Sequence, residues 1–111
     1  MRLTERERQA IIQSIRRFFP DAKRILLFGS RGDDTKRGGD IDLLVETLQP
    51  AESRYRKAAQ AVASIQLLLG ERKIDLVLAY PEGTEEDRKD SRPIVQVARQ
   101  TGVPLEDVAG S

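Results

Sequence analysis

The sequence predicts a single small α/β (α+β) domain, residues 1–111, in which a mixed β-sheet is flanked by helices. The first observation is length, because 111 residues suffice for one hydrophobic core and leave no room for a second. The second is periodicity, since apolar residues with helical or strand-like spacing follow in the order helix, strand, strand, helix, strand, helix. The third is composition: 39% hydrophobic and 33% charged residues are typical of a globular chain with a polar surface.

The N-terminal segment predicts a helix over about residues 4–18. Thr4 and Glu7 have the spacing of a capping box, in which each side chain accepts a hydrogen bond from a free amide of the first turn. Apolar residues then recur at helical spacing, and Pro20 ends the pattern.

Three apolar runs predict strands. Residues 22–28 contain the run RILLF, and residues 40–46 read DIDLLVE after a polar, glycine-rich segment. Residues 73–79, KIDLVLA, form the third strand. The charged stretch 82–92 that follows is expected to be a loop or a short helix.

Two further helices complete the expected fold. Apolar residues share one helical face from about residue 51 to residue 69, and Gly70 is a suitable stop. The last helix is expected over 93–101, with its proline in the first turn and Gly102 as its cap. The polar tail after Leu105 is expected to be frayed.

Composition excludes several classes of chemistry. Cysteine and histidine are both absent, which removes disulfides, thiol nucleophiles, Cys/His zinc sites and imidazole catalysis. The remaining oxygen ligands favour Mg²⁺ or Mn²⁺. A net charge of +1 gives no broad positive field for nucleic acid. No apolar stretch approaches the ~18 residues of a membrane span, and the N-terminus lacks the apolar part of a signal peptide, so a cytoplasmic protein is expected.

Three aspartates are the candidate ligands for such a cation. Because a strand alternates its faces, Asp40 and Asp42 point the same way, about 7 Å apart, and repel each other unless water or a cation screens them. Asp75 lies in an otherwise apolar strand, where an unpaired carboxylate is costly. If the two strands pair, one metal centre could collect all three. The alternative for Asp40 and Asp42 is that they begin a strand beside solvent. The alternative for Asp75 is an edge position in the sheet, or an ion pair with Arg72 or Lys73.

A possible phosphate site follows the first strand. Gly29 lets the backbone approach a ligand closely, the hydroxyl of Ser30 can donate to phosphate oxygens, and Arg31 adds positive charge. An ordinary strand-ending turn is the alternative interpretation. The segment is not a P-loop, because no Gly-Lys-Ser/Thr follows.

Taken together, these features resemble the nucleotidyltransferase superfamily that includes DNA polymerase beta and kanamycin nucleotidyltransferase. The shared pattern is a strand, Gly29-Ser30, nine intervening residues, the pair Asp40 and Asp42, and Asp75 on a later strand. The text LLFGSRGDD…GGDIDLLVE is most similar to minimal nucleotidyltransferase (MNT) domains, and the resemblance covers about residues 5–105. The spacing is one residue shorter than in many members of that branch.

The resemblance implies a nucleotidyltransferase fold and a set of roles. Asp40 and Asp42 would bind Mg²⁺ or Mn²⁺, and Asp75 would complete the metal site and help to activate the attacking hydroxyl. Gly29 and Ser30 would bind the triphosphate of ATP, the substrate. Arg31 would contact phosphate.

The resemblance also implies a biological role and a partner. Members of the branch are similar to antitoxins paired with a HEPN-domain ribonuclease toxin, and some transfer AMP from ATP to a hydroxyl of that toxin. The expected partners are therefore the toxin and a nucleoside triphosphate, with neither a membrane nor direct binding of nucleic acid. The competing hypothesis is a catalytically weak or inactive MNT-fold antitoxin that neutralises its toxin by binding alone.

Overall fold

The computed structural model describes residues 3–29, 40–48 and 51–106. All six predicted elements are present within two residues of their expected bounds, and the charged stretch contains a short helix. A two-residue strand after the last helix was not predicted. The elements in chain order are α1 Glu5–Phe18, β1 Arg24–Phe28, β2 Ile41–Glu46, α2 Ala51–Leu69, β3 Ile74–Ala79, α3 Glu85–Arg88, α4 Pro93–Thr101 and β4 Val103–Pro104.

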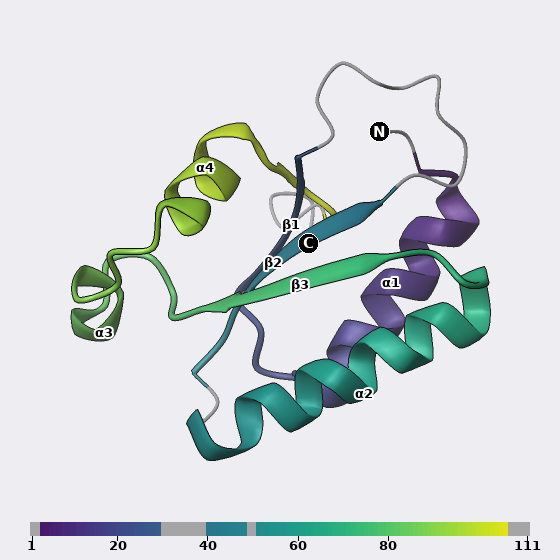
Figure 1. Ribbon diagram of the computed structural model, residues 1–111, viewed down its shortest axis with the longest axis horizontal. Helices are drawn as coiled ribbons and strands as arrows, with labels where there is room; N and C mark the ends of the chain where they lie inside the picture. Colours follow the sequence, from purple (N-terminus) through teal and green to yellow (C-terminus); the bar gives the residue numbers. More distant parts are fainter. Residues whose placement is uncertain (1–2, 30–39, 49–50, 107–111) are drawn as a thin grey trace.

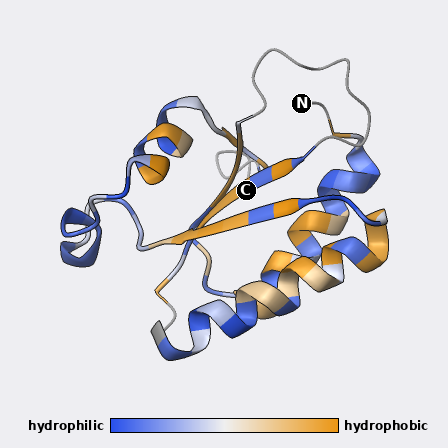
Figure 2. Cartoon of the chain, in the orientation of Figure 1, coloured by the Kyte–Doolittle hydropathy of each residue, from blue (hydrophilic) through white to orange (hydrophobic). Residues whose placement is uncertain are grey.

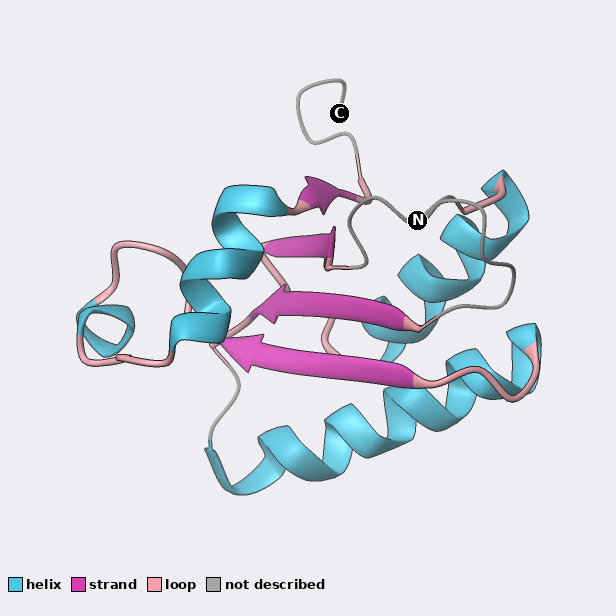
Figure 3. Ribbon diagram, turned by 45° about the horizontal axis from the view of Figure 1, so that its top comes forward, coloured by secondary structure: helices cyan, strands magenta, loops and turns pink. Residues whose placement is uncertain are grey.

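The strands form one mixed sheet, as predicted for the fold class, and their order is β3-β2-β1-β4. β2 pairs antiparallel with β1 and parallel with β3, while β4 pairs antiparallel with β1. The parallel pair requires a crossover, and α2 supplies it. β3 therefore lies at one edge of the sheet, with α2 running along it (Figure 1, Figure 3).

Helices cover the two faces of the sheet, and β2 is buried between them. Ile41, Leu43 and Val45 pack with α1 and α2 in the larger apolar cluster, as the period of two predicts. Leu44 packs on the opposite face with Val95 of α4. Full burial of each such side chain contributes about 1.5–3 kcal/mol. The strands are accordingly mostly apolar, whereas α3 is hydrophilic (Figure 2).

Local signals at the chain ends have mixed outcomes. Thr4 and Glu7 form the predicted capping box, with N–H···O distances of 2.9 and 3.0 Å. Leu105 is buried and donates its amide to the Ile25 carbonyl. Glu106 forms an ion pair with Arg16 of α1, so the expected fraying does not begin directly after Leu105. Residues 107–111 lie outside the described part of the chain.

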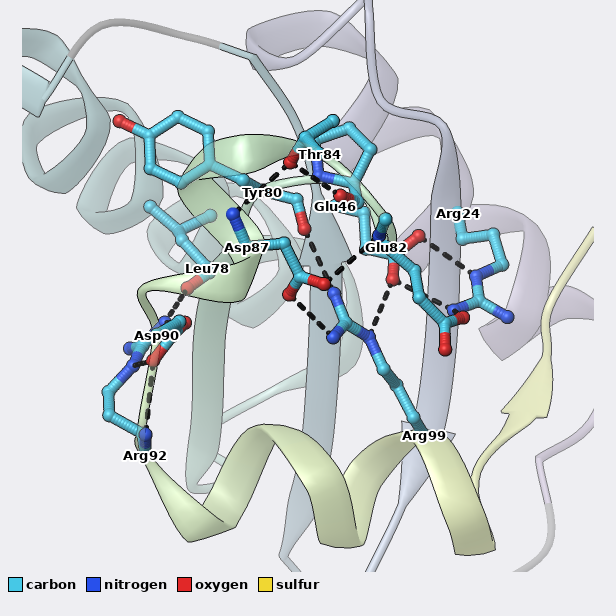
Figure 4. A network of polar contacts seen from close by, with 12 residues as sticks. Arg24, Glu46, Leu78, Tyr80, Glu82, Thr84, Asp87, Asp90, Arg92 and Arg99 are labelled. Atoms are coloured by element: carbon cyan, nitrogen blue, oxygen red, sulfur yellow. Dashed lines mark hydrogen bonds and ion pairs between the residues drawn. The ribbon is translucent and has the colours of Figure 1, made fainter.

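A buried ion-pair network fastens α4 to the end of the sheet (Figure 4). Glu46, at the end of β2, accepts two hydrogen bonds from Arg24 and one of 2.9 Å from Arg99 of α4. Arg99 also donates to Asp87 at 2.7 Å and to the Tyr80 carbonyl at 2.9 Å. These contacts link β1, β2, the segment around α3 and α4. Among the described residues, no helix is long and apolar enough to span a bilayer.

Candidate functional site

The sheet brings two of the predicted aspartates together. In the parallel pairing of β2 with β3, Asp42 lies directly beside Asp75, and in the antiparallel pairing with β1 it lies beside Phe28. Neighbouring strands are about 4.8 Å apart, and residues in register point to the same face. The start of β2, the start of β3 and the end of β1 therefore meet at one end of the sheet, with two carboxylates and Gly29 among them.

The carboxylates of this site repel one another. Partial burial raises the pKa of Asp42, and the negative charge of Asp75, a hydrogen bond with Asp75 and the charge of Asp40 raise this pKa further. Lys73 acts in the opposite direction. Asp42 is half-buried, whereas Asp40 and Asp75 are exposed. A bound cation would relieve this repulsion, which is the electrostatic feature expected of a metal-binding pair.

The oxygen chemistry of this pair fits Mg²⁺. Such a cation is commonly held by one or two carboxylates together with phosphate oxygens of the substrate and water. Within residues 3–29, 40–48 and 51–106, no group of three or more carboxylates is arranged to hold a metal ion. Asp40 lies just before β2, and its influence on Asp42 is through its charge. The metal site of three aspartates thus stays a prediction.

The alternative interpretations of Asp75 have different outcomes. β3 is an edge strand, and Asp75 is exposed, as the first alternative held. Arg72 instead forms an ion pair with Glu7 of α1 at 2.7 Å. The edge position is therefore correct, and it also places Asp75 as the outermost carboxylate of the pair.

Gly29 is required by geometry at this end of the sheet. Its φ of +74° lies in the left-handed region, which L side chains rarely adopt. A Cβ at this position would also collide with Oδ2 of Asp42. The backbone of Gly29 therefore lies directly against the Asp42 carboxylate, a reason for glycine beyond an ordinary turn. The predicted phosphate ligands Ser30 and Arg31 lie outside the described residues.

A pocket of about 780 Å³ extends from the two aspartates along the edge of β3. Its walls are mostly apolar and come from both layers of helices, which sequence analysis did not predict. The one sequence feature that could have indicated this pocket is that α4 carries more apolar residues than the core buries. Ile94 and Val97 stay 42% and 41% exposed. The main wall residues are Ala58, Ala59, Val62 and Ala63 of α2, Leu76 and Val77 of β3, and Ile94 and Val97 of α4.

Comparison with known proteins places this geometry in a family. The nucleotidyltransferase domain family matches residues 8–102. The chain is similar to the solved toxin–antitoxin MntA–HepT, at 20% identity over 96% of this chain and 75% of that chain, with a TM-score of 0.61. A toxin–antitoxin structure with AMP-PNP matches at 24% identity over 93% and 75%, also with a TM-score of 0.61.

A third similar structure is the tri-AMPylated HEPN toxin of Shewanella oneidensis in complex with an MNT antitoxin, at 22% identity over 94% and 72% with a TM-score of 0.59. Among curated proteins, none matches the chain significantly. At these identities the similar structures establish the fold.

Proposed function

Because the chain belongs to the nucleotidyltransferase domain family, we propose that it transfers AMP from ATP to a hydroxyl of a partner protein. We further propose that this partner is a HEPN ribonuclease toxin and that the chain is its antitoxin. The observation that carries the proposal is the placement of Asp42 beside Asp75, with Gly29 packed against the Asp42 carboxylate. The similar structures include an AMP-PNP complex and a tri-AMPylated HEPN toxin.

Each site residue has a proposed part in this reaction. The backbone of Gly29 with Ser30 and Arg31 would bind the triphosphate, and Asp40 and Asp42 would hold Mg²⁺. The cation would supply positive charge against the triphosphate oxygens. The acceptor oxygen forms a bond to the α-phosphorus while the bond to pyrophosphate breaks. Asp75 would accept the hydroxyl proton, since it is the exposed member of the carboxylate pair.

A cytoplasmic location belongs to this proposal, because ATP and Mg²⁺ are both available there.

The second candidate is an antitoxin that works by binding alone. Two features favour it: the described residues contain no preformed group of three carboxylates, and the nine residues between Ser30 and Asp40 are one fewer than the resemblance to MNT domains implies. In this case the fold would cover the toxin, and the carboxylates would have no part in neutralisation.

The double substitution Asp40→Ala with Asp42→Ala separates the two candidates. Labelled ATP, Mg²⁺ and the proposed HEPN partner are incubated with each variant, and label on the HEPN protein is measured. The enzyme predicts a loss of at least about 100-fold with the complex intact by gel filtration. Neutralisation retained by the double variant would favour the binding-only antitoxin. Glu86→Ala, which removes an exposed carboxylate of α3, is the matched control.

A further inference from the structure

The outer edge of β3 offers free backbone groups to the pocket. The Ile41 amide donates to the Lys73 carbonyl, and the Thr47 amide donates to the Ala79 carbonyl, both at 2.9 Å. Backbone groups alternate sides along a strand, so the odd-numbered residues of β3 face β2. The amide and carbonyl of Leu76 therefore point away from the sheet. No partner for them is found among the described residues.

Arg92 limits the length of this free edge. Its guanidinium donates to the Leu78 carbonyl at 2.6 Å, on the same outward side. Arg92 is held in turn by Asp90 at 2.8 Å. A cationic side chain across an edge strand blocks further pairing. The available edge therefore runs from Ile74 to the Leu78 amide, which is long enough for a segment of about four residues.

The walls of the pocket leave room for an extended chain beside this edge. On the α2 side the wall is built mainly of small residues, Ala58, Ala59 and Ala63. On the α4 side, Ile94 and Val97 are large, apolar and partly exposed. Edge strands that bind a peptide use the same combination, in which backbone pairing supplies affinity and flanking pockets select the side chains.

We propose that the edge of β3 binds an extended segment of the acceptor protein as an added strand, which brings the acceptor hydroxyl to Asp75. The inference rests on the proposed function and deepens it. Asp75 is the residue that identifies the occupant, because a side chain directly opposite on an added strand lies about 4.5–5.5 Å away. A hydroxyl-bearing residue at that place reaches the carboxylate that would take its proton.

The two walls specify the chemistry of this segment. Asp75 and Val77 point to the face covered by α4, because Val77 packs with the cluster that contains Val95. On the added strand, the residue two positions from the hydroxyl-bearing residue therefore lies against Val77, Ile94 and Val97. Because this surface is apolar, we expect an apolar residue there. The residue between these two points to the opposite face, toward the alanines of α2. Its type is restricted only by the space beside these alanines. The expected segment is thus a hydroxyl residue, a variable residue and an apolar residue.

Amide exchange gives a direct test of the added strand. Exchange of the Leu76 amide is measured by ¹⁵N NMR in the protein alone and with the proposed HEPN partner. We expect exchange of this amide to slow by at least tenfold on binding. The Val77 amide faces β2 and serves as the internal control, with exchange that stays unchanged. Slow exchange of the Leu76 amide in the protein alone, dependent on concentration, would assign the edge to a second copy instead.

A pair of substitutions on α2 tests the wall independently. Ala63→Arg places a long charged side chain in the wall of the pocket, whereas Gln60→Arg adds the same charge at an exposed position outside the pocket. For Ala63→Arg we expect the KM for the acceptor protein to rise at least tenfold while the Kd for ATP, measured by calorimetry, stays unchanged. Gln60→Arg should match the wild type. Thermal unfolding confirms that both variants fold.

Failure of this inference differs from failure of the proposed function. If the wild type transfers AMP, but Ala63→Arg is as active as Gln60→Arg and the Leu76 amide is unprotected in the complex, the added strand is refuted and the proposed function stands. If the wild type neither binds ATP nor labels the HEPN protein, both are refuted.

Discussion

Substitution of Gly29 by alanine tests the geometry on which the site depends. Two effects act on the alanine variant. The left-handed backbone, with φ of +74°, is strained for any L residue, and the new Cβ collides with Oδ2 of Asp42. The collision can be relieved only by movement of the Asp42 carboxylate or of the turn. Movement of the carboxylate takes it away from Asp75, whereas movement of the turn takes the proposed triphosphate site at Gly29 away from both carboxylates.

The chain contains a control that separates these effects. Gly83 has φ of +92°, but a Cβ there meets no atom within 4 Å. Gly83→Ala therefore shares the backbone strain, about 1–2 kcal/mol, without the collision. Gly29→Ala adds the cost of displacing a side chain from its rotamer, about 1 kcal/mol. For a chain of this size the shared strain lowers Tm by about 4–8 °C.

Two measurements on the same pair of variants complete the test. Urea unfolding should give a loss of stability for Gly29→Ala that exceeds the loss for Gly83→Ala by about 1 kcal/mol. Transfer of AMP to the HEPN protein should fall by at least about 100-fold in Gly29→Ala, because displacement of a reacting group by about 1 Å has an effect of this size. Gly83→Ala should keep wild-type transfer. Wild-type transfer by a folded Gly29→Ala variant would refute the assigned position of Asp42.

Two further predictions concern charge. The raised pKa of Asp42 means that the folded protein binds this proton more tightly than the unfolded chain, so its contribution to stability falls as pH rises above the ordinary carboxyl range. Asp42→Asn should therefore resist urea better than the wild type at neutral pH, and this difference should be lost near pH ~3. Mg²⁺ should raise the Tm of the wild type but not the Tm of Asp42→Asn. If the variant and the wild type were equally stable at both pH values, the raised pKa of Asp42 would not be the cause. Glu46→Ala should cost about 3 kcal/mol in urea unfolding, because it removes the carboxylate that pairs with Arg99, whose side chain is only 6% exposed. The exposed control Glu86→Ala should change stability by less than about 0.5 kcal/mol. A similarly small effect of Glu46→Ala would show that Asp87 and the Tyr80 carbonyl are sufficient partners for Arg99.

Features that arise within one segment could be predicted from the sequence. The capping box at Thr4 and Glu7 and the apolar spacing that follows it are local, so α1 was located closely. The strand period of two was sufficient to place Ile41, Leu43 and Val45 in the core and Asp42 on the other face. Local sequence was insufficient for β4, since two residues carry too little pattern and pair only because α4 returns the chain to β1.

The sequence by itself therefore determined the type and order of the main elements, and it predicted which residues would bind a metal and a phosphate. Only the tertiary structure decided that Asp42 lies beside Asp75, that Gly29 packs against the Asp42 carboxylate, and that β3 is left as an open edge. The physical reason is that periodicity reports the face to which a side chain points. Strand order and register depend instead on contacts between segments that lie far apart in the sequence, such as the pairing of β2 with β3.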